Sequence, residues 1–326
     1  MDGPGVPWHT HGMIVSASRR TDIPAFYSDW LINRIRAGYC TVPNPFNKNA
    51  VSVVSLRPSD VSCFVFCTRN PRPLMRHLDE IDALGHRYYF QYTLVANPRP
   101  IDPRSPARDA AIATFRELAT RVGPGRMVWR YDPITLTELT PPDYHRGNFE
   151  YIAAALRGSA FRCVVSLLDP YRKIEKREAA LAREGVHLTY RPQMPESVTG
   201  PLLTDLARMA AENDMEIVSC AEDPGLDLYG IAPGKCIDDA IVNREWGLCV
   251  PPDKNPAMRP SCGCVMSRDI GMYDGCLFGC TYCYATSSFD RARANYRNHD
   301  PGSPSLLGWV QPPHGWEQQL TLFGPK

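Results

Sequence analysis

Short apolar runs alternate along this chain with longer segments of helical pattern. The short runs are rich in β-branched and aromatic residues, and they predict strands at residues 13–18, 62–67, 88–95, 127–131, 163–168, 216–220 and 269–273. The longer segments predict helices at residues 26–37, 73–84, 107–122, 144–156 and 201–213. Strand and helix repeated this often imply parallel pairing through right-handed crossovers. We therefore expect an α/β fold, either a partial or full (β/α) TIM-like barrel or a doubly wound sheet.

Polar residues cluster directly after several of the predicted strands. The clusters are SRRTD at 18–22, TRNP at 68–71, RYDP at 130–133, LDPY at 168–171 and CAED at 220–223. In α/β barrels the carboxyl ends of the strands form the active-site face. Turn and cap residues would give similar clusters, but that reading explains the recurring Arg and Asp less well.

Size and charge narrow the class of protein. A chain of 326 residues that is 44% hydrophobic can bury one large core without a second domain. The net charge of +1 gives no broad positive field that would attract nucleic acid, so any contact with nucleic acid needs a local basic patch. No stretch approaches the roughly 20 apolar residues of a membrane span, and no signal peptide is evident. We expect a cytoplasmic protein with no membrane partner.

Composition divides the chain into three parts. Residues 1–12 are rich in Gly and Pro without periodicity and predict a disordered extension. Residues 13–300 carry the strand and helix pattern and predict the barrel together with a C-terminal cysteine region. Residues 301–326 are rich in Pro, Gly and Ser and predict a flexible tail.

Cysteine usage points to a metal cofactor. Eight of the twelve cysteines lie from Cys220 to Cys283, which in a reducing compartment favours metal binding over disulfides. Cys276, Cys280 and Cys283 form a C-x3-C-x2-C motif. Three thiolates at this spacing can hold a [4Fe–4S] cluster and leave one iron open to a small molecule. The alternative is a zinc knuckle with a fourth ligand elsewhere, which would leave no catalytic position.

This motif, with the aromatic Tyr282 before its third cysteine, resembles the signature of the radical S-adenosylmethionine superfamily. The resemblance implies that the open iron binds S-adenosylmethionine and that an electron from the cluster releases methionine and a 5′-deoxyadenosyl radical. It also implies a catalytic role for the three cysteines, a cofactor contact at Tyr282, and an electron donor such as flavodoxin or ferredoxin.

The position of the motif departs from that superfamily, in which it follows the first barrel strand. Here it follows the last predicted strand, so we expect a circularly permuted barrel in which the cluster-bearing strand is last in the chain. The glycine-rich segment that often follows the second strand is missing. Ser18, Arg19, Arg20, Thr21 and Asp22 occupy its place.

Two strand ends resemble those of the spore photoproduct lyase branch of the superfamily. They are TRNP, beginning at Thr68, and RYDPI, beginning at Arg130. We expect Arg19, Arg20, Thr68 and Arg130 to contact the cofactor or a substrate phosphate. The body of the chain, with SASRRTDIPAFY near its start and the shorter CAE, CID and CGC, resembles a bacterial family known only as a domain of unknown function.

Four further cysteines suggest a second metal site. They are Cys220, Cys236, Cys262 and Cys264. Four thiolates could ligate an auxiliary [4Fe–4S] cluster, which we favour, or a structural zinc ion. The C-x-C pair is tight for either metal group, so buried free thiols remain the third alternative.

The end of the chain resembles the peptide by which bacterial repair proteins dock on the sliding clamp. Its residues are Gln319, Leu320, Leu322 and Phe323. Leucine and phenylalanine anchors suit an apolar pocket, and a tether would keep the enzyme on DNA. With the lyase-like strand ends, this tail points to a DNA base lesion as the substrate. The alternatives are a radical enzyme acting on a peptide, a tRNA or a small metabolite, and a non-catalytic iron–sulfur redox or scaffold protein.

Overall fold

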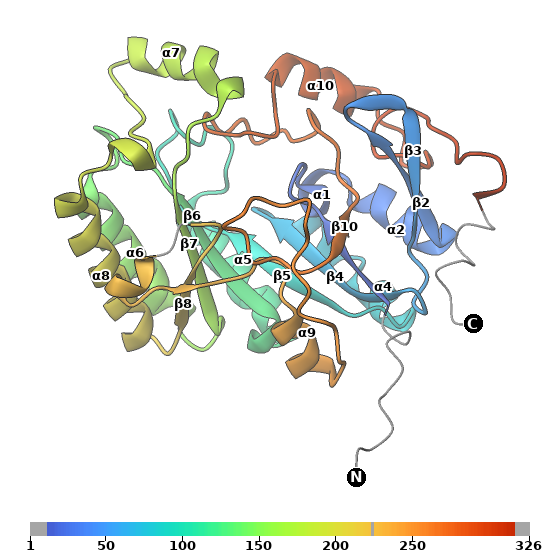
Figure 1. Cartoon of the computed structure of the whole chain (residues 1–326), viewed down its shortest axis with the longest axis horizontal. Coiled ribbons are helices and arrows are strands. Elements are labelled where there is room, and N and C mark those ends of the chain that lie inside the picture. The colour runs from blue at the N-terminus through green and yellow to red at the C-terminus, as the bar shows by residue number, and fades with distance from the viewer. Residues whose placement is uncertain (1–11, 223–224, 317–326) are drawn as a thin grey trace.

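A computed structural model describes residues 12–222 and 225–316. Within these residues eight parallel strands form one sheet in the order β10-β1-β4-β5-β6-β7-β8-β9 (Figure 1). The strands are β1 (Met13–Ala17), β4 (Val61–Thr68), β5 (Tyr88–Thr93), β6 (Met127–Ile134), β7 (Arg162–Leu167), β8 (Glu216–Ser219), β9 (Ala232–Pro233) and β10 (Ser267–Asp269). The expected parallel α/β fold is confirmed. Because β10 and β9 are edges of the sheet, it is consistent with a partial barrel rather than a closed one.

Helices fill most of the connections between these strands. They are α1 (Ile23–Phe26), α2 (Ser28–Ala37), α3 (Arg72–Met75), α4 (Leu78–Ala83), α5 (Arg108–Val122), α6 (Pro142–Leu156), α7 (Glu175–Arg183), α8 (Glu196–Glu212), α9 (Asp239–Trp246) and α10 (Phe289–Arg297). Short 3-10 turns cover Pro124–Arg126, Arg172–Ile174, Arg191–Gln193 and Leu226–Tyr229. A separate antiparallel hairpin joins β2 (Tyr39–Asn44) to β3 (Asn47–Ser55).

Both faces of the sheet are buried, as the apolar runs predict. Alternate side chains of a strand point to opposite faces. In β4, Phe64 and Phe66 join the large core, whereas Cys63 and Val65 join a second core that includes Ile241 of α9. Helix α9 therefore covers the face of the sheet opposite the large core.

Several predicted boundaries were wrong. The helix expected at 26–37 is two helices that meet at Tyr27, and the helix expected at 73–84 is likewise divided. The last strand ends at Asp269 rather than Tyr273. A Cβ on Gly271 would lie 1.8 Å from Ser18 Oγ, so only glycine permits this close approach of the chain beyond β10 to the end of β1. The hairpin and helices α7, α9 and α10 were missed.

The sequence predicted a flexible tail from residue 301. In the structure, the segment around Ser303 and Ser305 packs against the domain. Ser303 and Ser305 are fully buried. Trp30 Nε1 donates to Ser303 O at 2.9 Å, and Thr41 N donates to Pro304 O at 2.9 Å. These bonds tie the segment to α2 and β2. The clamp-like residues Gln319, Leu320, Leu322 and Phe323, and nearly all of the predicted extension at 1–12, lie outside the described residues.

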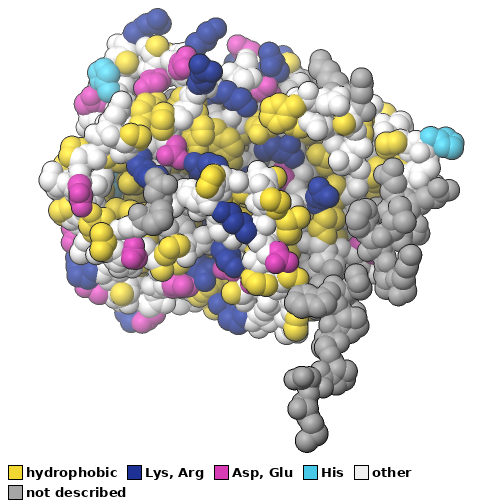
Figure 2. All heavy atoms as spheres, viewed as in Figure 1, with side chains coloured by type: hydrophobic (Ala, Val, Ile, Leu, Met, Phe, Trp, Pro, Cys, Tyr) yellow, Lys and Arg dark blue, Asp and Glu magenta, His cyan; other side chains and the backbone are white. Residues whose placement is uncertain are grey.

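The visible surface carries mixed charge. Figure 2 shows basic and acidic side chains interspersed with hydrophobic ones across one face, in keeping with the net charge of +1. In the described part of the chain, no helix has the length and apolar character needed to cross a membrane.

Candidate functional site

One cavity of about 500 Å³ lies at the carboxyl ends of the parallel strands. It is bordered by residues that directly follow β1, β4, β7 and β8, and by the cysteine motif beyond β10. Every cysteine and cofactor residue predicted for the two metal sites lines this cavity: Arg19, Arg20, Thr68, Arg130, Cys220, Cys236, Cys262, Cys264, Cys276, Cys280, Tyr282 and Cys283. These residues, which are up to 264 positions apart in the sequence, therefore line the same cavity.

The loop that carries Cys276, Cys280 and Cys283 has no regular secondary structure. Gly279 in this loop has a φ of 76°, a left-handed conformation that favours glycine. Phe278 packs on Phe26 with ring centroids 4.7 Å apart. We call residues 276–284 the cluster loop. Contacts with other segments hold the cluster loop, together with one backbone hydrogen bond of its own, from Cys283 N to Cys280 O at 3.1 Å.

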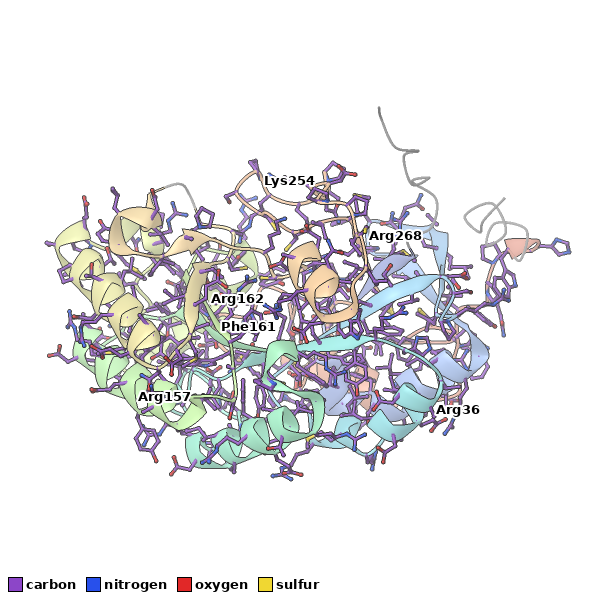
Figure 3. The ribbon with its side chains drawn as sticks, turned by 90° about the horizontal axis from the view of Figure 1, so that it is seen from below. Arg36, Arg157, Phe161, Arg162, Lys254 and Arg268 are labelled. Atoms are coloured by element: carbon purple, nitrogen blue, oxygen red, sulfur yellow. The ribbon has the colours of Figure 1, made fainter. Side chains whose placement is uncertain are left out.

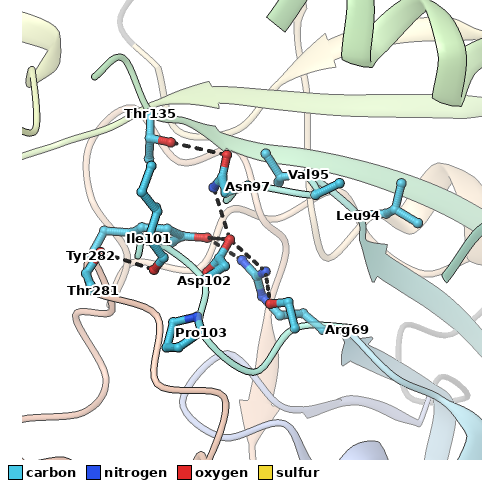
Figure 4. Close-up of polar contacts among 12 residues, drawn as sticks. Arg69, Leu94, Val95, Asn97, Ile101, Asp102, Pro103, Thr135, Thr281 and Tyr282 are labelled. Atoms are coloured by element: carbon cyan, nitrogen blue, oxygen red, sulfur yellow. Dashed lines mark hydrogen bonds and ion pairs between the residues drawn. The ribbon is translucent and has the colours of Figure 1, made fainter. Parts of the chain in front are cut away.

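A buried carboxylate anchors the cluster loop (Figure 4). Asp102 Oδ2 accepts hydrogen bonds from Tyr282 OH at 2.9 Å and from Asn97 Nδ2 at 3.0 Å, and it pairs with Arg69 Nη1 at 3.2 Å. Arg69 Nη2 also donates to Tyr282 OH. Thr281 N bonds to Ile101 O at 3.0 Å beside it. The hydroxyl of Tyr282 is therefore committed to positioning the loop, a network that the sequence did not reveal because Asp102 belongs to no motif.

Arg177 of α7 also contacts the cluster loop with its guanidinium group. Arg177 Nη2 donates to Cys283 O at 2.6 Å, and its guanidinium lies 4.9 Å from the ring centroid of Phe289. Burial raises the pKa of Cys276 to about 12 and raises the pKa of Cys280 well above its usual value, although Arg69 opposes the shift at Cys280. Without a bound cation both thiols stay protonated at neutral pH, so metal loading must release protons.

A single metal ion and a polynuclear cluster need different arrangements of thiols. A mononuclear site holds all its sulfurs about 2.3 Å from one zinc ion. No three His, Cys, Asp or Glu side chains within residues 12–222 and 225–316 are arranged to hold one metal ion. A [4Fe–4S] cluster takes one thiolate per iron, so its ligands need not converge on a point. Three thiols on the cluster loop would leave one iron without a protein ligand.

Arg19 and Arg20 lie near this site but are already paired. Asp269 lies 3.5 Å from Arg19 Nε and 3.1 Å from Arg20 Nε, and Arg20 Nη2 also donates to Asp269 O at 2.9 Å. Both guanidinium groups thus join the end of β1 to β10. Thr68 Oγ1 accepts a bond from Asn70 N at 3.0 Å. These contacts hold the strand ends that border the cavity.

Two buried carboxyl groups in the cavity wall had been noted only as members of polar clusters. Burial raises the pKa of Asp22 to about 7, while Asp22 Oδ2 accepts from Arg69 N at 2.6 Å. Burial likewise raises the pKa of Glu222 to about 7, and Glu222 Oε2 lies 3.3 Å from Arg191 Nη1. Perturbed acids in a cavity are typical of functional sites.

Arg130 belongs to the second group of cysteines. Its Nη1 lies 2.6 Å from Cys236 Sγ, and its Nη2 lies 3.6 Å from Cys220 Sγ and bonds to Asp132. The sequence assigned Arg130 to the cofactor or a substrate phosphate. In the structure its direct partners are the thiols of Cys236 and Cys220, the carboxylate of Asp132 and Gln91 Oε1.

Comparison with known proteins gives a family. Residues 14–285 match the family described as a domain of unknown function, DUF1848. The chain belongs to this family. The DUF1848 match takes in the parallel sheet, both groups of cysteines and the whole cluster loop, and it ends before α10. None of the curated proteins compared matches the chain. The expected resemblance to a domain of unknown function is thus confirmed.

Proposed function

We propose that this DUF1848 protein is a radical S-adenosylmethionine enzyme, with Cys276, Cys280 and Cys283 as ligands of a [4Fe–4S] cluster. The observation that carries the proposal is the placement of three thiols on one loop, at the wall of a cavity beyond the carboxyl ends of a parallel sheet. When bound, the cluster supplies the electron that cleaves S-adenosylmethionine to methionine and a 5′-deoxyadenosyl radical. In α/β folds ligands bind at this edge of the sheet.

The spatial order of the strands supports a permuted barrel of that superfamily. β10 pairs in parallel with β1, and β4 to β8 then follow in chain order. If counting starts from β10, the cluster loop follows the first strand of the sheet and SRRTD at 18–22 follows the second. The chain order is thus a rotation of the order expected for the superfamily, with the strand neighbours unchanged.

The residues of the chain provide positioning and enclosure. Arg69 and Asp102 hold Tyr282, and so hold the backbone between Cys280 and Cys283. Tyr284 OH donates to Arg19 O at 2.7 Å, and its ring lies 5.4 Å from that of Tyr171. These two rings flank a cavity whose volume of about 500 Å³ is in the range of small-molecule sites.

The test is anaerobic reconstitution with iron and sulfide, reduction with dithionite, and chromatography for 5′-deoxyadenosine after addition of S-adenosylmethionine. We expect product from the wild type and none from C276A/C280A/C283A. Cys67→Ala is the matched control, because Cys67 lines the same cavity but belongs to neither group of cysteines. Iron-loaded wild type that forms no deoxyadenosine above the triple variant would contradict the proposal.

The substrate part of the proposal is a base lesion in DNA, reached by docking on the sliding clamp. Arg69 and Arg130 each pair with a carboxylate of their own, and Arg19 and Arg20 share that of Asp269, so these four side chains leave one positive charge in excess for a phosphate. The remaining support is the sequence of the tail and of the two strand ends. Capture of the full chain by immobilised clamp should be lost in L322A/F323A and kept in Thr321→Ala. Equal capture of all three proteins would remove the DNA assignment and favour another substrate class.

A further inference from the structure

Four cysteines outside the cluster loop meet on another part of the cavity wall. Cys220 follows β8, Cys236 precedes α9, and Cys262 and Cys264 lie between α9 and β10. Cys220 Sγ lies 2.8 Å from Cys236 Sγ. Cys236 also contacts Cys264 through its side chain, and Cys264 contacts Cys262. The sulfur atoms thus form a continuous row, which we call the four-thiol row.

The fold holds Cys236 in place through its backbone. Cys236 O accepts hydrogen bonds from Tyr89 OH at 2.7 Å and from Gln91 Nε2 at 2.9 Å, both from strand β5. Asp238 N donates to Tyr89 OH at 3.0 Å, and Asp238 caps α9 by accepting from Ala240 N at 2.8 Å. The start of α9 and the strand beneath it therefore fix this thiol.

An ion pair between β7 and the residue that caps α9 adds to these contacts. Arg162 Nη1 lies 2.5 Å from Asp238 Oδ2, and Arg162 and Phe161 are drawn close to α9 in Figure 3. Arg244 of α9 lies 4.1 Å from the ring centroid of Phe161. These contacts hold α9, and with it Cys236, against the sheet.

The segment with the other two thiols is also built into the site. Ile237 N donates to Cys264 Sγ at 3.4 Å, and Val265 N donates to Ile237 O at 3.1 Å. Ser261 Oγ donates to Ala221 O at 3.0 Å, next to Cys220. Three separate segments are thus joined to one another directly around the sulfurs.

A buried cation lies beside the four-thiol row. The guanidinium of Arg130 contacts the sulfurs of Cys236 and Cys220, and only 13% of its side chain is exposed. A buried cation beside a row of thiols stabilises the negative charge that metal ligation requires.

We propose that Cys220, Cys236, Cys262 and Cys264 ligate a second iron–sulfur cluster, separate from the one assigned to the cluster loop. The Sγ–Sγ distance of 2.8 Å exceeds the length of a disulfide, about 2.05 Å, and these cysteines are free. Side-chain contacts link all four thiols, from Cys220 through Cys236 and Cys264 to Cys262. Four thiolates are the protein ligands of [2Fe–2S] and of [4Fe–4S] clusters. The second cluster would then have no open iron.

The test uses the full chain with the first site removed, so it does not depend on the proposed enzyme activity. C276A/C280A/C283A is reconstituted anaerobically with iron and sulfide, and iron, acid-labile sulfide and zinc are measured per chain. We expect about two or four irons with matching sulfide. Adding Cys236→Ala to the triple variant should abolish this iron, whereas adding Cys67→Ala should not.

Two results would overturn the second cluster. One is a folded triple variant, judged by circular dichroism, that holds no sulfide-bound iron or holds only zinc. The other applies if the triple variant fails to fold: a reconstituted wild type with no more than about four irons per chain has room for only one [4Fe–4S] cluster. Iron above that number in the wild type, in sulfide-bound form, supports the proposal.

Discussion

The cluster loop and the four-thiol row face the same cavity but are built in opposite ways. The cluster loop presents three thiols within eight consecutive residues, Cys276 to Cys283, and other segments hold it from outside through Tyr282, Asp102 and Arg69. The four-thiol row draws its members from three segments spanning residues 220–264, and its sulfurs contact one another and Arg130 directly. Three ligands leave an open iron, whereas four ligands close the cluster. If both proposed clusters are present, the first site can bind a small molecule at its metal and the second cannot.

The largest expected effect comes from removing a ligand of the cluster loop. Cys280→Ala should reduce deoxyadenosine formation to background, a greater loss than the roughly 10- to 100-fold that outer contacts cause. Cys262→Ala should leave the iron of the cluster loop in place. Chromatography for deoxyadenosine together with iron analysis compares the two variants. If Cys280→Ala retained wild-type activity, the assignment of the first site would be wrong.

Next in size is the loss of a positioning contact. Tyr282→Phe removes the donor to the buried Asp102. We expect iron affinity or activity to fall about 10- to 100-fold, because the loop is less well oriented. The matched control is Tyr284→Phe. The hydroxyl of this exposed tyrosine donates to Arg19 O and takes no part in the Asp102 network. Equal effects of both substitutions on iron affinity would show that the Asp102 network has no special role.

Iron binding at the four-thiol row should depend on Arg130, as iron binding at the cluster loop depends on Tyr282. Arg130→Lys keeps the charge but loses the planar fork that reaches both Cys220 and Cys236. We expect weaker iron binding at the row by about tenfold, with iron at the cluster loop unchanged. Iron titration of the C276A/C280A/C283A background, with and without Arg130→Lys, measures this. Unchanged affinity would show that Arg130 is not needed for ligation.

The smallest expected effect concerns backbone conformation. Gly279 has φ +76 and Gly263 has no positive φ, so Gly279→Ala should be more destabilising than Gly263→Ala. A left-handed residue other than glycine is disfavoured by about 1–2 kcal/mol. Urea unfolding of the metal-free chain compares the two variants. A larger loss in Gly263→Ala, whose added Cβ would lie 3.1 Å from Gly234 O, would show that packing outweighs conformation.

The same contrast explains what the sequence could predict. Long buried strands such as β4 and β7 were found because apolar β-branched runs are local signals. The cluster loop was found because its ligands have a fixed spacing. The four cysteines of the four-thiol row were grouped from residue type alone. The contacts that Cys236 makes with Cys220 and with Cys264 depend on how α9 packs on the sheet, which the sequence pattern does not give. Asp102 was missed because Arg69 and Tyr282, two of its partners, come from other segments and leave no spacing pattern.

The central claim is that one site has an open iron and the other does not. The most direct measurement is the electron paramagnetic resonance spectrum of dithionite-reduced protein before and after addition of S-adenosylmethionine. We predict that the spectrum of the wild type changes and that the spectrum of reconstituted C276A/C280A/C283A does not. An unchanged spectrum in iron-loaded wild type, or a change that persists in the triple variant, would contradict the account.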